Sequence, residues 1–194
     1  MKVNEIFYSL QGEGAHTGTP AVFVRFSGCN LKCPFCDTDF RDGKEMDEYE
    51  IVDEVCRQGI QAPLVVITGG EPTLQVTEEL IDLLHQNGFK VAMETNGTRT
   101  APKGIDWLTI SPKEAYVGKV GKPVLTKCQE LKVVFDMEHE PNDFGIDAEH
   151  YYLQPCDTGD KQKNQQIIEQ LIEYVKDNPK WKISLQTQKL LNVR

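Results

Sequence analysis

Three cysteines stand close together in the segment "FSGCNLKCPFCDTDF" at positions 26–40. Cys29, Cys33 and Cys36 follow the spacing C-x3-C-x2-C, and no second close group of cysteines occurs in the sequence. Structural zinc sites usually hold four ligands, and iron–sulfur cubanes ordinarily take four thiolates. Three thiolates would leave one iron open to a substrate or cofactor, as a catalytic zinc keeps one position open. A three-cysteine zinc site with a distant fourth ligand such as His16 is the alternative.

Two glycine-containing motifs carry carboxylate and amide groups. In "TGGEPTLQ" the two glycines allow a ligand to approach the backbone closely, and Glu71 offers a carboxylate for an ammonium group. In "ETNGT" Glu94 and Asn96 have the oxygen and nitrogen atoms to hydrogen-bond ribose hydroxyls. Taken singly, Gly-Gly-Glu-Pro and Asn-Gly are also ordinary turn sequences, so neither motif identifies a site alone.

Two further motifs are weaker. "SPK" places Ser111 and Lys113 where they would suit a ribose or a carboxylate, and "LQPCD" offers Gln154 and Asp157. Each is equally compatible with an ordinary turn, so only a shared position in the fold would give them weight.

The elements around these motifs alternate between strands and helices. Apolar, β-rich runs predict strands at 5–10, 21–26, 64–68, 90–95, 106–111, 130–135, 151–155 and 181–187. Amphipathic periodicity predicts helices at 47–59, 75–88 and 162–179. Repeated β–α units with apolar strands indicate a parallel sheet covered by helices. For 136–150 a helix, a loop and a partner-docking surface all remain open.

The chain is 194 residues long, shorter than the roughly 250 residues of a complete eight-fold barrel. Helices between 95 and 130 are also missing or very short. We therefore expect an α/β fold, either a partial open barrel with about six parallel core strands or a doubly wound sheet, forming one domain over 1–194. Every motif above directly follows a predicted strand. Because parallel strands share one carboxyl edge, the motifs should converge there in an enzyme or cofactor site.

Bulk properties narrow the function classes. A net charge of −9 disfavours broad contact with nucleic-acid phosphates. No run of about 18 apolar residues predicts a membrane span, and the first residues lack the apolar core of a secretory signal. A cytoplasmic location is expected, where clustered cysteines more often bind metal or do redox chemistry than form disulfides.

The cysteine triplet, with a strand before it and Phe35 before its last cysteine, resembles the radical S-adenosylmethionine (SAM) family. The resemblance implies a [4Fe-4S] cluster held by Cys29, Cys33 and Cys36, with SAM on the fourth iron as the source of a 5′-deoxyadenosyl radical. "TGGEP" is similar to the family motif whose glutamate and backbone bind the methionyl amine.

Blocks over nearly the whole chain, including "SLQGEG", "CDTDF", "YYLQP" and "SLQTQKLLNVR", resemble the 7-carboxy-7-deazaguanine synthases of queuosine and deazapurine synthesis. This resemblance implies conversion of 6-carboxy-5,6,7,8-tetrahydropterin to 7-carboxy-7-deazaguanine, with loss of ammonia and hydrogen abstraction at C6. SAM would act as a reusable cofactor, Mg2+ would bind at the substrate, and no protein residue would serve as a general acid or base.

The resemblance also assigns residues to ligands. SAM would contact Phe35, Gly70, Glu71, Glu94, Asn96, Ser111, Pro112, Lys113, Gln154, Pro155, Cys156 and Asp157. Substrate would contact Leu10, Gln11, Gly12, Arg25, Thr68 and Arg194, the last through its terminal carboxylate.

Arg25 and Thr38 have competing interpretations. An arginine near the end of an apolar strand is better explained by a buried anion than by a solvated head group, so Arg25 is expected to pair with the substrate carboxylate. Thr38 would supply an oxygen to Mg2+, which prefers oxygen ligands. From spacing alone, Asp37 and Asp39 are rival ligands.

One position departs from the family pattern: the sequence has "QTQK", with Gln188 where relatives often have histidine. Glutamine cannot carry a proton at neutral pH, so acid–base work at this position is in doubt. The family implies a flavodoxin- or ferredoxin-type electron donor and a homodimer. Two other functions remain open: a small glycyl-radical activating enzyme, and a non-catalytic cysteine-rich metal module.

Overall fold

One mixed sheet runs through the protein. The computed structural model describes residues 1–39, 42–59 and 61–193. Within them the sheet has nine strands in the order β3-β1-β2-β4-β5-β6-β7-β8-β9. The strands are β1 Lys2–Leu10, β2 Pro20–Phe26, β3 Lys44–Glu45, β4 Leu64–Gly69, β5 Lys90–Thr95, β6 Trp107–Ile110, β7 Lys127–Phe135, β8 Asp147–Pro155 and β9 Lys182–Ile183.

The sheet is parallel from β2 to β9, and only β1 and β3 run antiparallel to their neighbours. It does not close, because β3 and β9 are free edges of the strand order. The predicted partial, open barrel with mostly parallel strands is therefore confirmed.

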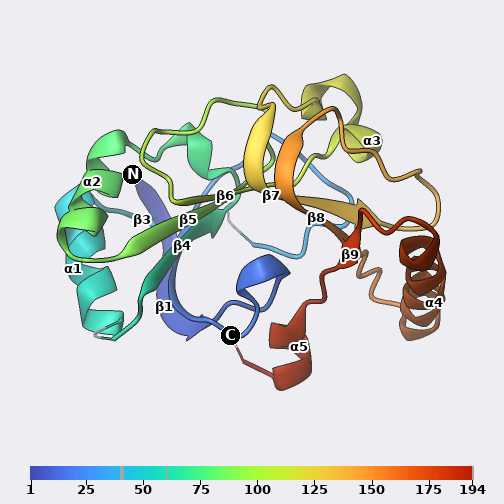
Figure 1. Ribbon diagram of the computed structural model, residues 1–194. Helices are drawn as coiled ribbons and strands as arrows, with labels where there is room; N and C mark the ends of the chain where they lie inside the picture. Colours follow the sequence, from blue (N-terminus) through green and yellow to red (C-terminus); the bar gives the residue numbers. More distant parts are fainter. Residues whose placement is uncertain (40–41, 60, 194) are drawn as a thin grey trace.

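Three substantial helices cover the sheet, and two short ones line its loops. They are α1 Glu48–Gln58, α2 Glu78–Gln86, α3 Glu114–Val117, α4 Lys161–Asp177 and α5 Thr187–Leu191. Figure 1 shows α1 and α2 together at one end of the sheet and α4 at the other. The three predicted helices are confirmed, and the helical structure between 95 and 130 is limited to the short α3 and a 3-10 turn. None of the helices in the described residues has the length and apolar character needed to span a bilayer.

Local sequence explains where the three long helices begin. Asp47 and Glu50 form a reciprocal capping box at the start of α1. Thr77 and Asp160 cap α2 and α4, each accepting hydrogen bonds from free backbone N–H groups of the first turn.

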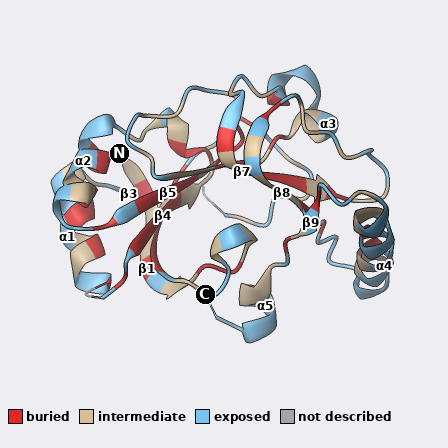
Figure 2. Ribbon diagram, viewed as in Figure 1, coloured by how far each residue is buried: buried red, intermediate tan, exposed pale blue. Residues whose placement is uncertain are grey.

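Strand alternation separates the face covered by the long helices α1, α2 and α4 from the opposite face, which these three helices leave uncovered. In β2, Val22 and Val24 pack in one core with Ile51 of α1, whereas Phe23 joins Val66 of β4 on the opposite side. Successive strand residues point to opposite faces, so Arg25 lies on the same side as Phe23. Figure 2 shows the buried residues concentrated along these strands.

The second half of the sheet repeats this division. Leu131 and Leu153 pack against Ile167 and Leu171 of α4. By alternation, the neighbours Lys132 and Gln154 point to the face opposite the long helices. Polar side chains of both halves thus share one side of the sheet.

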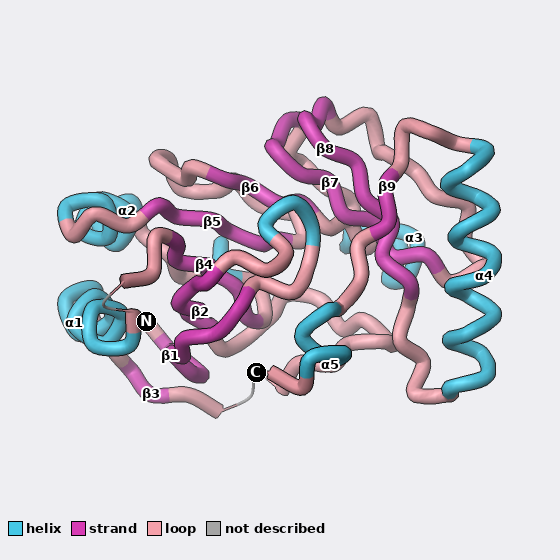
Figure 3. The backbone as a smooth tube through the Cα atoms, turned by 60° about the horizontal axis from the view of Figure 1, so that its bottom comes forward, coloured by secondary structure: helices cyan, strands magenta, loops and turns pink. Residues whose placement is uncertain are grey.

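The end of the chain differs from the prediction. Instead of a strand over 181–187, β9 has two residues and α5 follows at Thr187. The reason is a competing set of partners: the backbone N–H and hydroxyl of Thr187 both donate to the Gly12 carbonyl, and Ser184 Oγ accepts from the Gly14 N–H. Figures 1 and 3 show α5 beside the loop that follows β1. Of the alternatives at 136–150, the structure excludes a helix, because a loop leads into β8 at Asp147.

Candidate active site

A cavity of about 1180 Å³ opens at the carboxyl ends of the parallel strands, on the face opposite the long helices α1, α2 and α4. Its volume exceeds that of a typical single-ligand pocket, so it can hold more than one ligand. Of the predicted site residues that the structure describes, all line it except Glu71 and Pro112. The five motifs that follow strands in the sequence therefore do converge.

The three cysteines lie in this cavity wall as free thiols. Burial raises the pKa of Cys29 and Cys33, while the positive charge of Lys113 opposes that rise. Zinc would draw its sulfur ligands to about 2.3 Å from one point. No three cysteine, histidine or carboxylate side chains in the described residues are grouped to hold one ion.

Three unpaired thiols spread along one wall fit a cluster whose separate irons each take one thiolate. His16, the alternative fourth zinc ligand, packs edge-on against Trp107 with ring centroids 4.5 Å apart and does not line the cavity.

The Gly-Gly turn after β4 packs directly against the cysteine loop. A Cβ on Gly70 would stand 1.9 Å from the Gly28 carbonyl oxygen, so no larger residue fits there. The Glu71 N–H donates to that same oxygen at 2.9 Å. The glycine pair therefore serves first to bring two backbone segments together.

The Glu71 side chain, predicted to contact SAM, bonds to neighbouring loops in this structure. It is fully buried and lies outside the cavity wall. Its oxygens accept hydrogen bonds from Thr95 Oγ1 at 2.7 Å and from the Asn96 N–H at 2.8 Å, and also from Thr73. Burial requires the carboxylate to be satisfied, and it is satisfied by the loop after β5. Glu71 thus joins two loops instead of presenting its charge to a ligand.

Asn96 continues this connection to the cysteine loop. Its amide nitrogen donates to Asn30 Oδ1 at 3.0 Å, and Asn30 in turn donates to Thr98 Oγ1 at 2.8 Å. The three loops after β2, β4 and β5 are therefore bonded to one another beneath the cavity.

Arg25 reaches the cavity from β2, next to Thr68 in the register of β4. Its Nε donates to Glu5 Oε1 at 2.8 Å. The guanidinium is about one-fifth exposed, so it is held within the wall and not extended into solvent.

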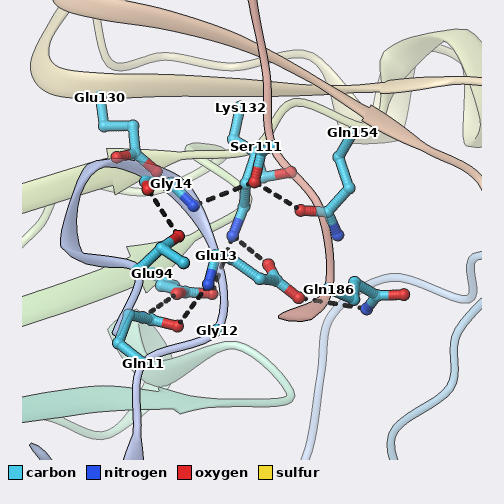
Figure 4. A network of polar contacts seen from close by, with 12 residues as sticks. Gln11, Gly12, Glu13, Gly14, Glu94, Ser111, Glu130, Lys132, Gln154 and Gln186 are labelled. Carbon is cyan, nitrogen blue, oxygen red and sulfur yellow. Dashed lines mark hydrogen bonds and ion pairs between the residues drawn. The ribbon is translucent and has the colours of Figure 1, made fainter. Parts of the chain in front are cut away.

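A buried lysine that the sequence analysis did not select occupies the centre of the wall (Figure 4). Lys132 on β7 pairs with Glu13 and, at 3.4 Å, with Glu94. Burial alone would raise the pKa of Glu13, but Lys132 and the amides of Gln186 and Gln188 lower it to about 2. Burial likewise would lower the pKa of Lys132, and the surrounding carboxylates raise it above its ordinary value. Both groups are therefore charged at neutral pH.

Ser111 and Lys113 form a compact pair at the end of β6. The Lys113 ammonium donates to the Ser111 carbonyl at 2.7 Å and to its hydroxyl at 2.6 Å. Burial lowers the pKa of Lys113 to about 8. Pro112, between them, lines a separate cavity of about 500 Å³, so its predicted contact with SAM is not supported by this geometry.

Lys189 joins the cysteine loop to the loop after β8. Its ammonium lies 3.1 Å from Asp37 Oδ2 and 2.7 Å from Asp157 Oδ2. The hydrogen bond from Lys189 lowers the pKa of Asp157 to about 2. Thr38 lines the cavity beside this pair.

The C-terminal segment completes the wall. Gln186 and Gln188 both donate to Glu13 Oε1, at 3.1 and 3.2 Å. Arg194, predicted to contact substrate, lies outside the described residues.

Sequence reasoning missed Lys132 and Gln186. The signal that selected Arg25, a cation inside an apolar strand, also occurs in "ELKVVF" and would have found Lys132. Gln186 carries no comparable signal, because its contact depends on the turn that ends β9.

Comparison with known proteins identifies the family of the chain. Residues 23–115 match the Radical SAM superfamily. The chain is 48% identical to the 7-carboxy-7-deazaguanine synthase of Bacteroides thetaiotaomicron, over 100% of this chain and 98% of that protein. It is 42% identical to the synthase of Caulobacter vibrioides, over 98% of each. The crystal structure of QueE from Escherichia coli superimposes with a TM-score of 0.70 at 28% identity, covering 95% of this chain and 92% of that one.

Proposed function

This chain belongs to the 7-carboxy-7-deazaguanine synthase family of radical SAM enzymes, and we propose that it converts 6-carboxy-5,6,7,8-tetrahydropterin to 7-carboxy-7-deazaguanine with loss of ammonia. The observation that carries the proposal is the meeting of the three free thiols with Arg25 in one cavity wall. A carboxylated substrate and a thiolate-held cluster would both find their partners there.

Cys29, Cys33 and Cys36 would hold the [4Fe-4S] cluster. When bound, cluster and SAM together supply the radical that removes hydrogen from C6 of the substrate. Phe35, Gly70, Asn96 and the other predicted SAM contacts in the cavity wall would bind the cofactor.

Arg25 would bind the substrate carboxylate, because a guanidinium presents parallel N–H groups that match its two oxygens. Thr68 stands beside Arg25 in the sheet register and would contact the same end of the substrate. Leu10, Gln11 and Gly12 would bind the pterin ring from the loop after β1. Together these contacts would orient C6 toward the cysteine wall.

Thr38 would contribute an oxygen to Mg2+. Of its two acidic rivals, Asp37 is engaged by Lys189 and Gln186, and Asp39 also lines the cavity. Because the described residues hold no ready cluster of three ligands, substrate oxygens and water would complete the coordination, as Mg2+ commonly requires.

We also propose that residues 1–194 act as one radical SAM domain in a homodimer located in the cytoplasm. A flavodoxin- or ferredoxin-type protein would supply the electron. The support is family membership, together with the single sheet that runs through the chain.

The test is anaerobic reconstitution with iron and sulfide, followed by SAM, dithionite, Mg2+ and the carboxytetrahydropterin. Formation of 7-carboxy-7-deazaguanine is expected. SAM cleavage without this product would contradict the proposal and favour a glycyl-radical activating enzyme, and tight zinc binding without iron uptake would favour a metal module. Cys33→Ser should lose iron and activity, whereas Cys56→Ser, on α1 and outside the cavity, should keep both.

A further inference from the structure

We propose that Lys132 is a positioning residue for the substrate end of the cavity: through Glu13 and Glu94 it fixes the Gln11 side chain and the C-terminal segment 186–188. The consequence for pterin binding rests on the proposed function. The contacts themselves do not.

Lys132 is a buried cation whose charge must be compensated by partners. Its side chain is 6% exposed and comes from the middle of β7, on the face opposite the long helices. Taking a cation out of water is costly unless partners compensate for the lost hydration. The two carboxylates that compensate come from different elements, Glu13 from the loop after β1 and Glu94 from β5. One rigid strand residue therefore holds two separate segments.

One series of contacts runs from Lys132 through Glu94 to Gln11 and returns to Lys132 through Glu13. Glu94 pairs with Lys132 through Oε2 and accepts from Gln11 Nε2 at 3.0 Å through Oε1. Gln11 Oε1 accepts from the Glu13 N–H at 3.1 Å, and the Glu13 side chain returns to Lys132. Both ends of the Gln11 amide are thereby fixed, and one N–H and one lone pair remain for a ligand. Figure 4 shows Gln11, Glu94, Glu13 and Lys132 facing one another.

A second series of contacts runs from Lys132 through Glu13 to the C-terminal segment. Glu13 Oε1 accepts from Gln186 and Gln188, and the Thr187 N–H donates to the Gly12 carbonyl at 3.0 Å. Segment 186–188 is therefore held against the loop after β1 by the same carboxylate that Lys132 holds.

The charges around Lys132 explain why its loss should disturb Gln11 and the C-terminal segment. Glu13, Glu94 and Glu130 act on it from three elements, and Lys113 is the other nearby cation. Replacing Lys132 by an apolar residue removes the cation on which Glu13, Glu94 and Glu130 all act, and Lys113 then opposes only Glu13 and Glu94. Leaving buried charges unpaired is strongly unfavourable, so the carboxylates should move apart or take up a proton. Either response releases Gln11 and the C-terminal segment.

The test measures binding of 6-carboxypterin, an oxidised analogue, to the reconstituted holoenzyme by fluorescence titration. Lys132→Met should raise its Kd by about tenfold or more, with iron content and the Kd of SAM within about twofold of wild type. Adding Glu13→Gln to Lys132→Met should recover part of the loss, because it removes one unpaired charge. Lys127→Met, exposed on the same strand, is the matched control and should bind like wild type.

Two results would overturn the inference: unchanged 6-carboxypterin binding in Lys132→Met, or equal weakening of SAM and pterin binding, which indicates general disruption. If Lys132→Met does not fold, Lys132→Arg should keep the charge and most of the binding.

Hydrogen exchange separates this inference from the proposed function. If wild type binds no carboxypterin, the proposed function fails. Lys132→Met should still speed exchange at the Glu13 and Thr187 amides relative to the amides of β7. Unchanged exchange at those two amides would overturn the role of Lys132 whatever the ligand is.

Discussion

Cations placed inside apolar strands are the residues that most directly mark this site. Arg25 on β2 and Lys132 on β7 both lie on the face opposite the long helices and both line the cavity. Each is paired with glutamate from another segment, which makes burial of the charge tolerable. Their difference is one of access: Arg25 is about one-fifth exposed, whereas Lys132 is almost fully enclosed by its carboxylates.

Arg25→Lys should raise KM for the carboxytetrahydropterin by about tenfold with a smaller effect on kcat, because lysine keeps the charge but loses the paired N–H geometry. Arg25→Gln should raise KM further. Steady-state kinetics of the reconstituted enzyme make the measurement, and an unchanged KM in both variants would exclude a contact between Arg25 and the substrate carboxylate.

Thr38→Ala should raise the Mg2+ concentration needed for half-maximal activity, since it removes the proposed protein oxygen ligand. Asp37→Ala is the matched comparison, because Asp37 is already engaged by Lys189. Activity titrations with Mg2+ distinguish the two residues. The assignment is wrong if Asp37→Ala shifts the Mg2+ response and Thr38→Ala does not.

At the scale of elements, the loops at the carboxyl ends of β2, β4 and β5 behave as one unit. Gly70 permits contact between the first two loops, and Glu71 bonds the second to the third. The cysteine loop is therefore supported by neighbouring turns as well as by its own internal hydrogen bonds.

Gly70→Ala should lower the free energy of unfolding by about 2 kcal/mol, because its Cβ would overlap the Gly28 carbonyl oxygen. Iron content after reconstitution should fall as well, since the cysteine loop must shift. Gly88→Ala is the control: it has a positive φ but open space around its Cβ, so it should cost about 1 kcal/mol and leave iron content unchanged. Equal iron content in both variants would contradict the role of Gly70.

Elements whose own run of apolar residues reflects their burial could be predicted from the sequence. Apolar runs such as "AVFVRF" and "LVVIT" could be predicted as parallel strands, and the motifs that follow them could be placed at one edge. The segment 181–187 could not, because its partners are Gly12 and Gly14, far away in the chain. The contacts of Glu71 with Thr95 and Asn96 could not be predicted for the same reason, because they join loops that are distant in the chain.

At the scale of the whole molecule, one charged network links the two ends of the chain through the sheet. Glu13 near the start, Lys132 in the middle and Gln186 near the end meet at a single point (Figure 4). The wall of the active site is therefore also a tertiary contact between the N-terminal and C-terminal parts of the chain.

This network predicts a pH dependence of stability. The pKa of Glu13 falls from 4.5 to about 2 on folding, so its contribution is fully present above pH 4.5 and is lost as the pH falls toward 2. The loss is on the order of 3 kcal/mol at most. Denaturant unfolding between pH 5 and pH 2 should therefore show a smaller decline in Glu13→Gln than in wild type, while the exposed Glu149→Gln should follow wild type. Equal declines in wild type and Glu13→Gln would contradict this linkage.

Carboxytetrahydropterin labelled with deuterium at C6 reports directly on how the cavity holds the substrate. If the cavity orients this atom toward the cysteine wall, the reconstituted enzyme should form 7-carboxy-7-deazaguanine in excess of the SAM consumed. Recovered SAM should then carry deuterium on its 5′ carbon, as measured by mass spectrometry. Absence of the product, or product formed while recovered SAM stays unlabelled, would contradict the account.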